Sequence, residues 1–280
     1  MSRYALHDIC AARSLLFVPG NRPERFIRAT SARPDIVIID LEDAVGEADK
    51  DIARTHAHDW LGNGHAAMLR INAATTPWYQ ADCELVDEFG PPVMLPKSER
   101  TDQVRLLGAL HAGDVVVVPL IETATGILAA SQLAAQDCVA RLAFGSIDLA
   151  AQLGVEPDDR EALLFARSAL VLASAAAGCP PPIDGVTTVL DQADLVQQDF
   201  DYARGLGMTA KLCIHPKQIE IVHATAKPSA ELLAWAKTIV NAGNLRGSAL
   251  AVDGRMVDKP VLDRARKVLA DAGGQENPGE

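Results

Sequence analysis

Eight short apolar runs recur along the 280-residue chain and limit the folds it can adopt. Near-continuous runs of Val, Ile and Leu predict parallel strands that are buried on both faces. The runs cover residues 14–18, 35–41, 66–71, 93–96, 115–121, 141–145, 183–186 and 211–214. Segments of helical periodicity or composition lie between them, at residues 23–30, 48–61, 78–88, 102–110, 125–136, 159–177 and 193–205. Eight strands with intervening helices predict an α/β fold of the TIM (β/α)8 barrel type.

A doubly wound sheet is the alternative fold. Such sheets usually carry a glycine-rich phosphate turn after the first strand, whereas VPGNRPERF at residues 18–26 does not fit G-x-G-x-x-G. Beyond the eighth strand, helical segments at 229–242 and 260–272 and a short strand near 249–252 exceed a minimal barrel. We therefore expect residues 1–224 to form the catalytic barrel. Residues 225–280 would form a C-terminal arm or lid, which we interpret as an oligomer contact.

Composition narrows the cellular setting and the partners. The chain is 49% hydrophobic but only 4% aromatic, which suits buried strands covered by Ala-rich helices. Its apolar stretches are too short to span a bilayer, and no signal-peptide core opens the sequence, so we expect a cytoplasmic protein. The net charge of −11 argues against nucleic acid or an anionic membrane as partner. Five cysteines without a C-x-x-C pair indicate neither a disulfide framework nor a zinc cluster.

Charged residues cluster where four of the predicted strands end. The segments are DLEDAV at 40–45, LRIN at 69–72, PLIET at 119–123 and FGSID at 144–148. Because an α/β barrel places its chemistry at the carboxyl ends of its strands, these segments predict one site assembled from several strands.

The acidic residues of these segments suit a magnesium site. Glu122 and Asp148 both end strands, and Mg²⁺ prefers oxygen ligands while keeping several waters. Asp40, Glu42 and Asp43 close the second strand, where we expect them to support the metal-bound waters from a second layer. The carboxylates would also neutralise the charge of the ion.

Basic residues surround the predicted metal site. Arg70 ends the third strand, where its planar guanidinium could hold a substrate carboxylate bidentately. Arg22 and Arg25 follow the first strand and Lys97 follows the fourth, so a polyanionic ligand would be accommodated. Two other interpretations stay open: Asp148 could serve only as a helix cap, and Lys97 could be a Schiff-base lysine.

Eight segments together carry a family resemblance. RSLLFVPGNRPERF, IIDLEDAV, LRIN, LPKSE, PLIET, GSIDLA, KLCIHPKQI and VDGRMVDKP follow one another between residue 13 and about residue 270. In this order they resemble the citrate lyase β-subunit group of the HpcH/HpaI aldolase and citrate lyase superfamily. The resemblance implies a TIM barrel that uses Mg²⁺ to cleave or form a carbon–carbon bond in a 3-hydroxyacyl thioester. The second product would be a 2-oxo acid such as oxaloacetate, pyruvate or glyoxylate.

The resemblance also implies roles for individual residues. Glu122 and Asp148 match the metal ligands and Arg70 matches the carboxylate-binding arginine, while Glu42 and Asp43 match the acids behind the metal.

In relatives the C-terminal segment reaches a neighbouring subunit and supplies an acid from a motif that GRMVD at 254–258 matches. Asp258 is therefore the candidate catalytic acid or base, acting in a homotrimer or hexamer. Backbone N–H groups at Gly145 and Ser146 would meet the oxo acid. A CoA or acyl-carrier thioester would lie along the rim, against the basic residues already named.

Three functional interpretations follow from the sequence. The first is a lyase that acts alone on citryl-, malyl- or citramalyl-CoA. The second is a β-subunit-like lyase that requires an acyl-carrier subunit, and the third is a non-catalytic protein that binds an oxo acid or CoA. A class I aldolase using Lys97 is a fourth. The family pattern has an acid where this chain has Ile147, so a shift in substrate choice is expected.

Overall fold

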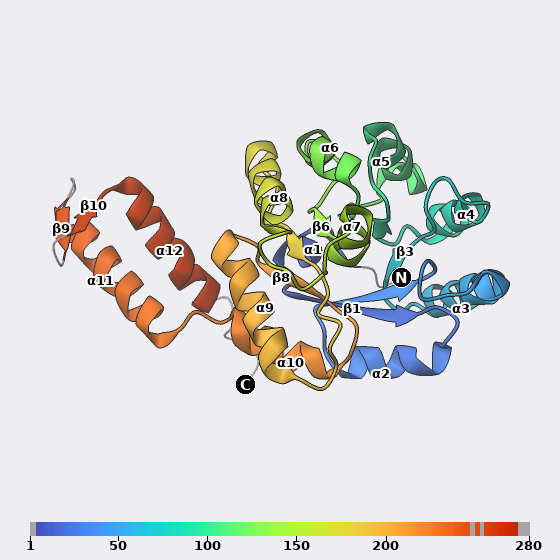
Figure 1. Cartoon of the computed structure of the whole chain (residues 1–280), viewed down its shortest axis with the longest axis horizontal. Helices are drawn as coiled ribbons and strands as arrows, with labels where there is room; N and C mark the ends of the chain where they lie inside the picture. The colour runs from blue at the N-terminus through green and yellow to red at the C-terminus, as the bar shows by residue number, and fades with distance from the viewer. Residues whose placement is uncertain (1–3, 247–249, 253–254, 274–280) are drawn as a thin grey trace. The chain divides into compact units, whose positions relative to one another are not determined.

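Eight parallel strands close into a barrel in the computed structural model, which describes residues 4–246, 250–252 and 255–273 (Figure 1). The chain divides into two compact units, residues 1–223 and 224–280. Each strand pairs with the next, and β8 pairs with β1 through Leu15 and Leu212, so the sheet has no open edge. The prediction of a TIM-type α/β barrel is confirmed, and the doubly wound sheet is excluded.

All eight predicted strands are present. They are β1 (Ser14–Pro19), β2 (Ile36–Asp40), β3 (Met68–Arg70), β4 (Val93–Leu95), β5 (Val117–Ile121), β6 (Ala143–Phe144), β7 (Ile183–Asp184) and β8 (Ala210–Cys213). Most are shorter than their apolar runs. Side chains of alternate strand residues, such as Leu15, Ile38, Met94 and Leu120, fill the buried core.

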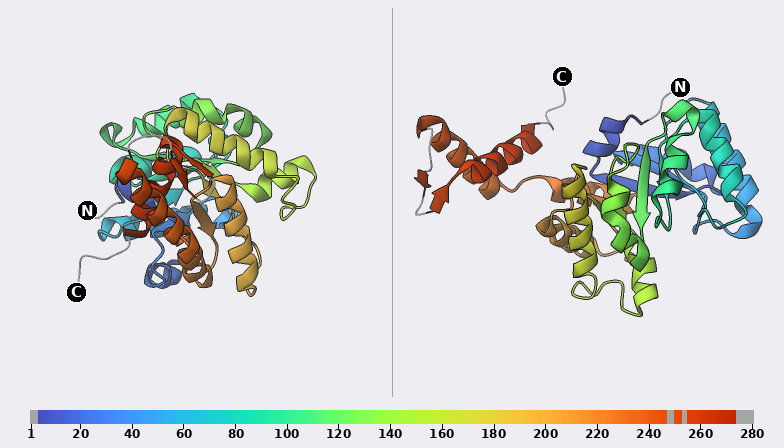
Figure 2. Two further views of the ribbon diagram at one scale, coloured as in Figure 1. Left: turned by 90° about the vertical axis from the view of Figure 1, so that its left-hand side faces the viewer. Right: turned by 90° about the horizontal axis from the view of Figure 1, so that it is seen from above.

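Helices surround the barrel (Figures 1 and 2). The α-helices of the first unit are α1 (Leu6–Ala11), α2 (Phe26–Ser31), α3 (Lys50–Gly62), α4 (Tyr79–Phe89), α5 (Thr101–Gly108), α6 (Ala124–Ala134), α7 (Ser146–Leu153), α8 (Leu164–Ala177) and α9 (Ala193–Leu206). Its short 3-10 helices are η1 (Pro23–Arg25), η2 (Glu47–Asp49) and η3 (His111–Gly113). Helix α10 (Lys217–Ala226) runs across the boundary of the two units. The sequence did not predict α1, α7 or α10. The predicted helix at 159–177 also begins five residues before α8, because residues 160–163 form turns.

The amino-terminal end of the barrel is organised by Arg141, which is fully buried. Its guanidinium donates to the carbonyl oxygens of Ala12 (2.7 Å) and Pro181 (2.8 Å) and to Oγ1 of Thr209 (2.9 Å). Burial without an acidic partner among these contacts lowers its pKa to about 10. These bonds tie the segment after α1 to the loops that precede β7 and β8, at the end of the barrel opposite the charged strand ends.

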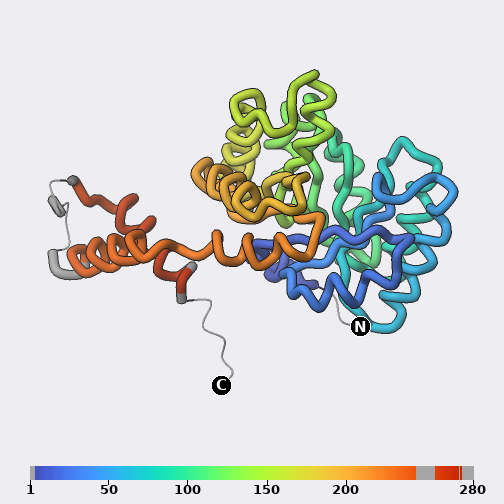
Figure 3. Tube along the Cα trace, turned by 60° about the horizontal axis from the view of Figure 1, so that its bottom comes forward, coloured from blue at the N-terminus to red at the C-terminus, as the bar shows by residue number. Residues whose placement is uncertain are grey.

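The second unit consists of two antiparallel-packed helices and a hairpin. Helix α11 (Ala230–Arg246) contacts α12 (Lys259–Gly273), and β9 (Leu250–Val252) pairs antiparallel with β10 (Arg255–Val257) (Figure 3). Its own small core contains Ala236, Ile239, Val257 and Ala265. The expected role of this unit as a lid or oligomer contact stays a prediction. Among the described residues, no helix has the length and apolar character needed to cross a bilayer.

Candidate active site

A cavity of about 280 Å³ opens among the carboxyl ends of the barrel strands. Its inner wall is apolar and is formed by Phe17, Leu120, Phe144 and Leu212. The predicted site residues that line it are Asp40, Asp43, Arg70, Glu122, Gly145, Ser146 and Asp148. The four charged segments, which lie up to 108 positions apart in the sequence, therefore meet around one space, because parallel strands deliver their carboxyl ends to the same rim.

Asp40 holds Arg70 in a fixed orientation. Asp40 ends β2 directly beside Arg70 at the end of β3, and the carboxylate accepts from Nε (2.7 Å) and Nη2 (2.5 Å) of the guanidinium. The ring of Phe17 lies against the guanidinium, 4.7 Å from Cζ. The remaining nitrogen, Nη1, lies 3.3 Å from Oε2 of Glu42 and 4.0 Å from Oδ2 of Asp43. These acids raise the pKa of Arg70 against the effect of its burial, so the guanidinium stays charged.

Lys50 fixes the loop after β2, a role that the sequence did not predict. Its ammonium is buried and donates to the carbonyl oxygens of Leu41 and Glu42, both at 2.8 Å. The N–H of Glu42 in turn donates to Oδ1 of Asp40 (2.9 Å). The only sequence signal for Lys50 is a lysine that follows an acidic loop, and nothing in that pattern distinguishes it from an exposed helix-start residue.

Glu122 is almost completely buried at the end of β5. Its Oε1 accepts the backbone N–H of Lys97 (2.8 Å). Burial raises its pKa to about 8, and the nearby carboxylates of Glu42 and Asp148 contribute to the rise. Gly145 makes room for this side chain, because a Cβ at that position would overlap Cβ of Glu122 and would lie 2.6 Å from Oε2.

Asp148 occupies the first turn of α7, a helix that starts immediately after β6. The N-cap of α7 is Gly145, so Asp148 lies inside the helix and not at its cap, and the N–H of Gly145 donates to the carbonyl of Ile121 (2.9 Å). The cap interpretation therefore loses its main support. Gly145 contributes space for Glu122, while the first-turn N–H groups of Ser146 and Ile147 are the ones that α7 presents at its amino-terminal end.

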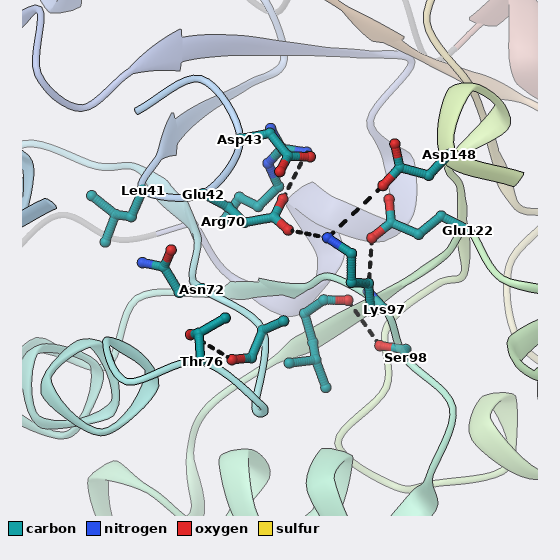
Figure 4. Close-up of polar contacts among 12 residues, drawn as sticks. Leu41, Glu42, Asp43, Arg70, Asn72, Thr76, Lys97, Ser98, Glu122 and Asp148 are labelled. Atoms are coloured by element: carbon teal, nitrogen blue, oxygen red, sulfur yellow. Dashed lines mark hydrogen bonds and ion pairs between the residues drawn. The ribbon is translucent and has the colours of Figure 1, made fainter. Parts of the chain in front are cut away.

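Lys97 projects between two groups of acids (Figure 4). Its Nζ donates to Oε1 of Glu42 (2.8 Å) and lies 3.9 Å from Oδ2 of Asp148. Partial burial would lower its pKa, but the hydrogen bond and charge of Glu42 raise it overall. A Schiff-base lysine requires the opposite shift, so the class I aldolase interpretation is disfavoured.

Apart from Arg70, the predicted basic residues, Lys97 included, are not among those that line this cavity. Arg25 lines a neighbouring cavity of about 340 Å³ that shares Phe17, Pro19 and Ile214 with the first. Arg22 is exposed before η1 and lines neither cavity. In the second unit, Oδ1 of Asp258 accepts the N–H of Val261 (3.2 Å) and so caps α12. The expected roles of these residues in binding the thioester and moving a proton stay predictions.

The carboxylates of this site suit a cation that keeps some of its coordination positions for water or substrate. Within the described part of the chain, no three His, Cys, Asp or Glu side chains converge as a closed metal cage. Glu122 and Asp148 can supply two oxygen ligands, which is the usual protein share for Mg²⁺. Among the described residues, Oε2 of Glu42 is buried and accepts no hydrogen bond, although Nη1 of Arg70 lies 3.3 Å away, and burial raises the pKa of Glu42.

Comparison with known proteins gives consistent matches along the chain. The family model described as HpcH/HpaI aldolase/citrate lyase matches residues 13–216. A citrate lyase subunit beta-like protein of Mycobacterium tuberculosis is 37% identical over 265 residues, which cover 92% of this chain and 94% of that protein. A (3S)-malyl-CoA thioesterase of Cereibacter sphaeroides is 30% identical over 276 residues, covering 95% and 96% of the two chains.

The solved structures agree with the sequence matches. Protein CitE from M. tuberculosis, crystallised in complex with magnesium, acetoacetate and coenzyme A, superposes with a TM-score of 0.84 at 36% identity. The match covers 94% of this chain and 99% of that one. With a family model that spans most of the barrel and relatives that align over nearly the full length, the chain belongs to the HpcH/HpaI aldolase/citrate lyase family.

Proposed function

We propose that this protein is a Mg²⁺-dependent carbon–carbon lyase. It would cleave a 3-hydroxyacyl thioester of the citryl-, malyl- or citramalyl-CoA type into an acyl thioester and a 2-oxo acid. Family membership supports a lyase-type enzyme. The observation that carries the finer proposal is the convergence of Glu122, Asp148 and Arg70 on one cavity at the carboxyl end of the barrel.

Glu122 and Asp148 would hold the metal in this proposal. The related CitE of M. tuberculosis has been crystallised with magnesium and pyruvate, and also with magnesium and acetoacetate. A bound Mg²⁺ would stabilise negative charge on the substrate oxygen that becomes the keto oxygen of the product. Glu42 and Asp43 would orient water around the ion from the loop after β2.

Arg70 would bind a carboxylate of the oxo acid. Asp40 and Phe17 fix its guanidinium plane, so little side-chain entropy is lost when a ligand binds. The first turn of α7, at Ser146, supports the same end of the ligand because helix amino termini favour anions.

The thioester would extend from the first cavity toward the second, where Arg25 is available and Arg22 lies on the same loop. Coenzyme A is among the ligands of the related CitE structure, and this chain would use the same class of thioester. Asp258 remains our candidate for the acid that protonates the acyl enolate, supplied by a neighbouring subunit of a homo-oligomer.

Hydrolysis of the thioester is the second candidate, because one relative is a (3S)-malyl-CoA thioesterase. The test is to incubate the purified protein with citryl-, malyl- and citramalyl-CoA, with Mg²⁺ or EDTA, and to measure 2-oxo acid and free CoA thiol separately. A lyase releases oxo acid without free thiol, and a thioesterase releases free thiol without oxo acid. Release of neither product, with Mg²⁺-dependent binding of an oxo acid retained, would favour a carrier-dependent subunit or a binding protein.

Loss of the metal ligands should abolish Mg²⁺-dependent turnover. Glu122→Gln and Asp148→Asn each remove one anionic oxygen ligand while preserving side-chain size, so the barrel should stay folded by circular dichroism. Full activity in either variant would refute the metal assignment.

A further inference from the structure

Lys97 has an unusual backbone conformation at the edge of the site. Its φ of 48° lies in the left-handed region, which is unfavourable for a residue other than glycine. The conformation directs the N–H of Lys97 to Oε1 of Glu122 (2.8 Å) and lets the side chain reach Glu42 and Asp148. Backbone strain maintained at a site where chemistry is expected points to a functional reason for the placement of this residue.

The ammonium of Lys97 compensates charge that no other group compensates fully. Arg70 gives two of its nitrogens to Asp40, and its third, Nη1, lies 3.3 Å from Oε2 of Glu42 without a hydrogen bond to that oxygen among the described residues. Lys97 reaches the other oxygen of Glu42 and lies 3.9 Å from Asp148. Glu122 also acts electrostatically on the ammonium. The positive charge of Lys97 therefore lies among the carboxylates that the proposed function assigns to the divalent cation.

The two partners of this ion pair differ in how easily they can move. The side chain of Glu42 is 6% exposed, and its backbone is fixed by Lys50 and Asp40, whereas the side chain of Lys97 is 43% exposed. A lysine has four rotatable side-chain bonds, so its ammonium can leave the cluster for water without disturbing the barrel. The acids stay in place when it does.

We propose that Lys97 is an internal cation that competes with the divalent metal: its ammonium neutralises Glu42 and Asp148 in the protein without the ion, and metal binding displaces it toward solvent. This inference rests on the proposed function, because it requires that Glu122 and Asp148 bind Mg²⁺. Lys97 then sets the affinity of the site, keeping it weaker than the carboxylates alone would allow.

The test is calorimetric titration of Mg²⁺ into the purified full-length protein without substrate. Lys97→Met removes the charge but keeps a long unbranched side chain, and it should bind Mg²⁺ about tenfold more tightly than wild type. That is the order expected when wild type must give up the attraction between the ammonium and the carboxylates of Glu42 and Asp148 in a water-like medium. Lys97→Arg keeps the charge and should stay within about twofold of wild type.

A matched control separates local competition from a general change in net charge. Lys217 follows β8 at the same end of the barrel and pairs with Asp191 (3.3 Å). Lys217→Met removes the same charge without touching the acids of the site and should leave Mg²⁺ affinity unchanged. Folding of each variant is checked by circular dichroism. If Lys97→Met proves unfolded, Lys97→Gln replaces it, with the same expected tightening.

The outcomes distinguish the inference from the function on which it rests. Equal or weaker Mg²⁺ binding by a folded, charge-neutral Lys97 variant would overturn the inference, because a residue that only supports the site lowers affinity when removed. An equal gain in Lys217→Met would overturn it too. If wild type and all variants fail to bind Mg²⁺, the metal site of the proposed function fails, and the inference fails with it.

Discussion

Gly145→Ala tests whether the packing around Glu122 determines the geometry of the site. The backbone of Gly145 has φ −94° and ψ 79°, so φ is negative and imposes no need for glycine. The effect of the substitution is therefore steric. The new Cβ would overlap Cβ of Glu122 and would lie 2.6 Å from Oε2, so at least about 0.8 Å must open at Oε2, and more at Cβ, before an ordinary contact of 3.4 Å is reached.

Two magnitudes follow from this overlap. Overpacking a buried position typically costs about 1–3 kcal/mol of unfolding free energy, and β5 and α7 flank the collision on both sides. A shift of about 1 Å in a catalytic group can reduce turnover about 100-fold, because a metal ligand must point at the ion. We therefore expect Gly145→Ala to stay folded, to lose about 1–3 kcal/mol of stability and to lose Mg²⁺ affinity and turnover by about two orders of magnitude.

Gly46→Ala is the matched control. Gly46 lies on the loop after β2, has a negative φ (−64°), and a Cβ there would meet nothing within 4 Å. Urea denaturation measures stability, and calorimetric titration measures Mg²⁺ binding. Gly46→Ala should match wild type in both. Wild-type Mg²⁺ affinity and turnover in Gly145→Ala would refute the reasoning, because Glu122 could then move without consequence.

Three further predictions concern single side chains. Arg70→Lys keeps the charge but cannot reproduce the paired bonds to Asp40, so the oxo-acid Kd should rise at least about tenfold by calorimetry; an unchanged Kd would move the carboxylate clamp elsewhere. Burial opposes ionisation of Asp35, but bonds from His223 and the N–H groups of Arg13 and Ser14 lower its pKa to about 2. Its folded pKa is thus below the unfolded value, so its stabilisation is complete above about pH 4 and is lost as pH falls toward 2. Asp35→Asn should lower the unfolding free energy, measured by urea denaturation at pH 7, by about 1–3 kcal/mol. It should also reduce the loss of stability between about pH 4 and pH 2, and an unchanged loss in that range would contradict the assignment. Borohydride with pyruvate should leave Lys97 unlabelled by mass spectrometry, since its ammonium is stabilised by Glu42, and labelling would restore the class I aldolase interpretation.

Local pattern was enough to predict the barrel and the polar residues that line the cavity. Each strand is a short apolar run, and its hydrophobic pattern and length differ from those of the helices between the strands. Because all the strands are parallel, their carboxyl ends lie at the same end of the barrel. Arg70, Glu122 and Asp148 could therefore be grouped from the sequence, although they lie at the ends of different strands or just beyond them. Helix α7 escaped prediction because its first turn coincides with the charged segment, which was interpreted mainly as a strand end, with a helix cap at Asp148 as the alternative.

The sequence by itself determined the fold, the end of the barrel that carries the chemistry and the residue types available there. Only the tertiary structure decided how the charges pair: Asp40 binds Arg70, Lys50 holds the loop below Glu42, and Lys97 reaches across to Glu42 and approaches Asp148. The reason is physical. Strand periodicity fixes which face a residue occupies, whereas the partner of a long charged side chain depends on distances of 3–4 Å between segments far apart in the chain, and no local pattern encodes those distances.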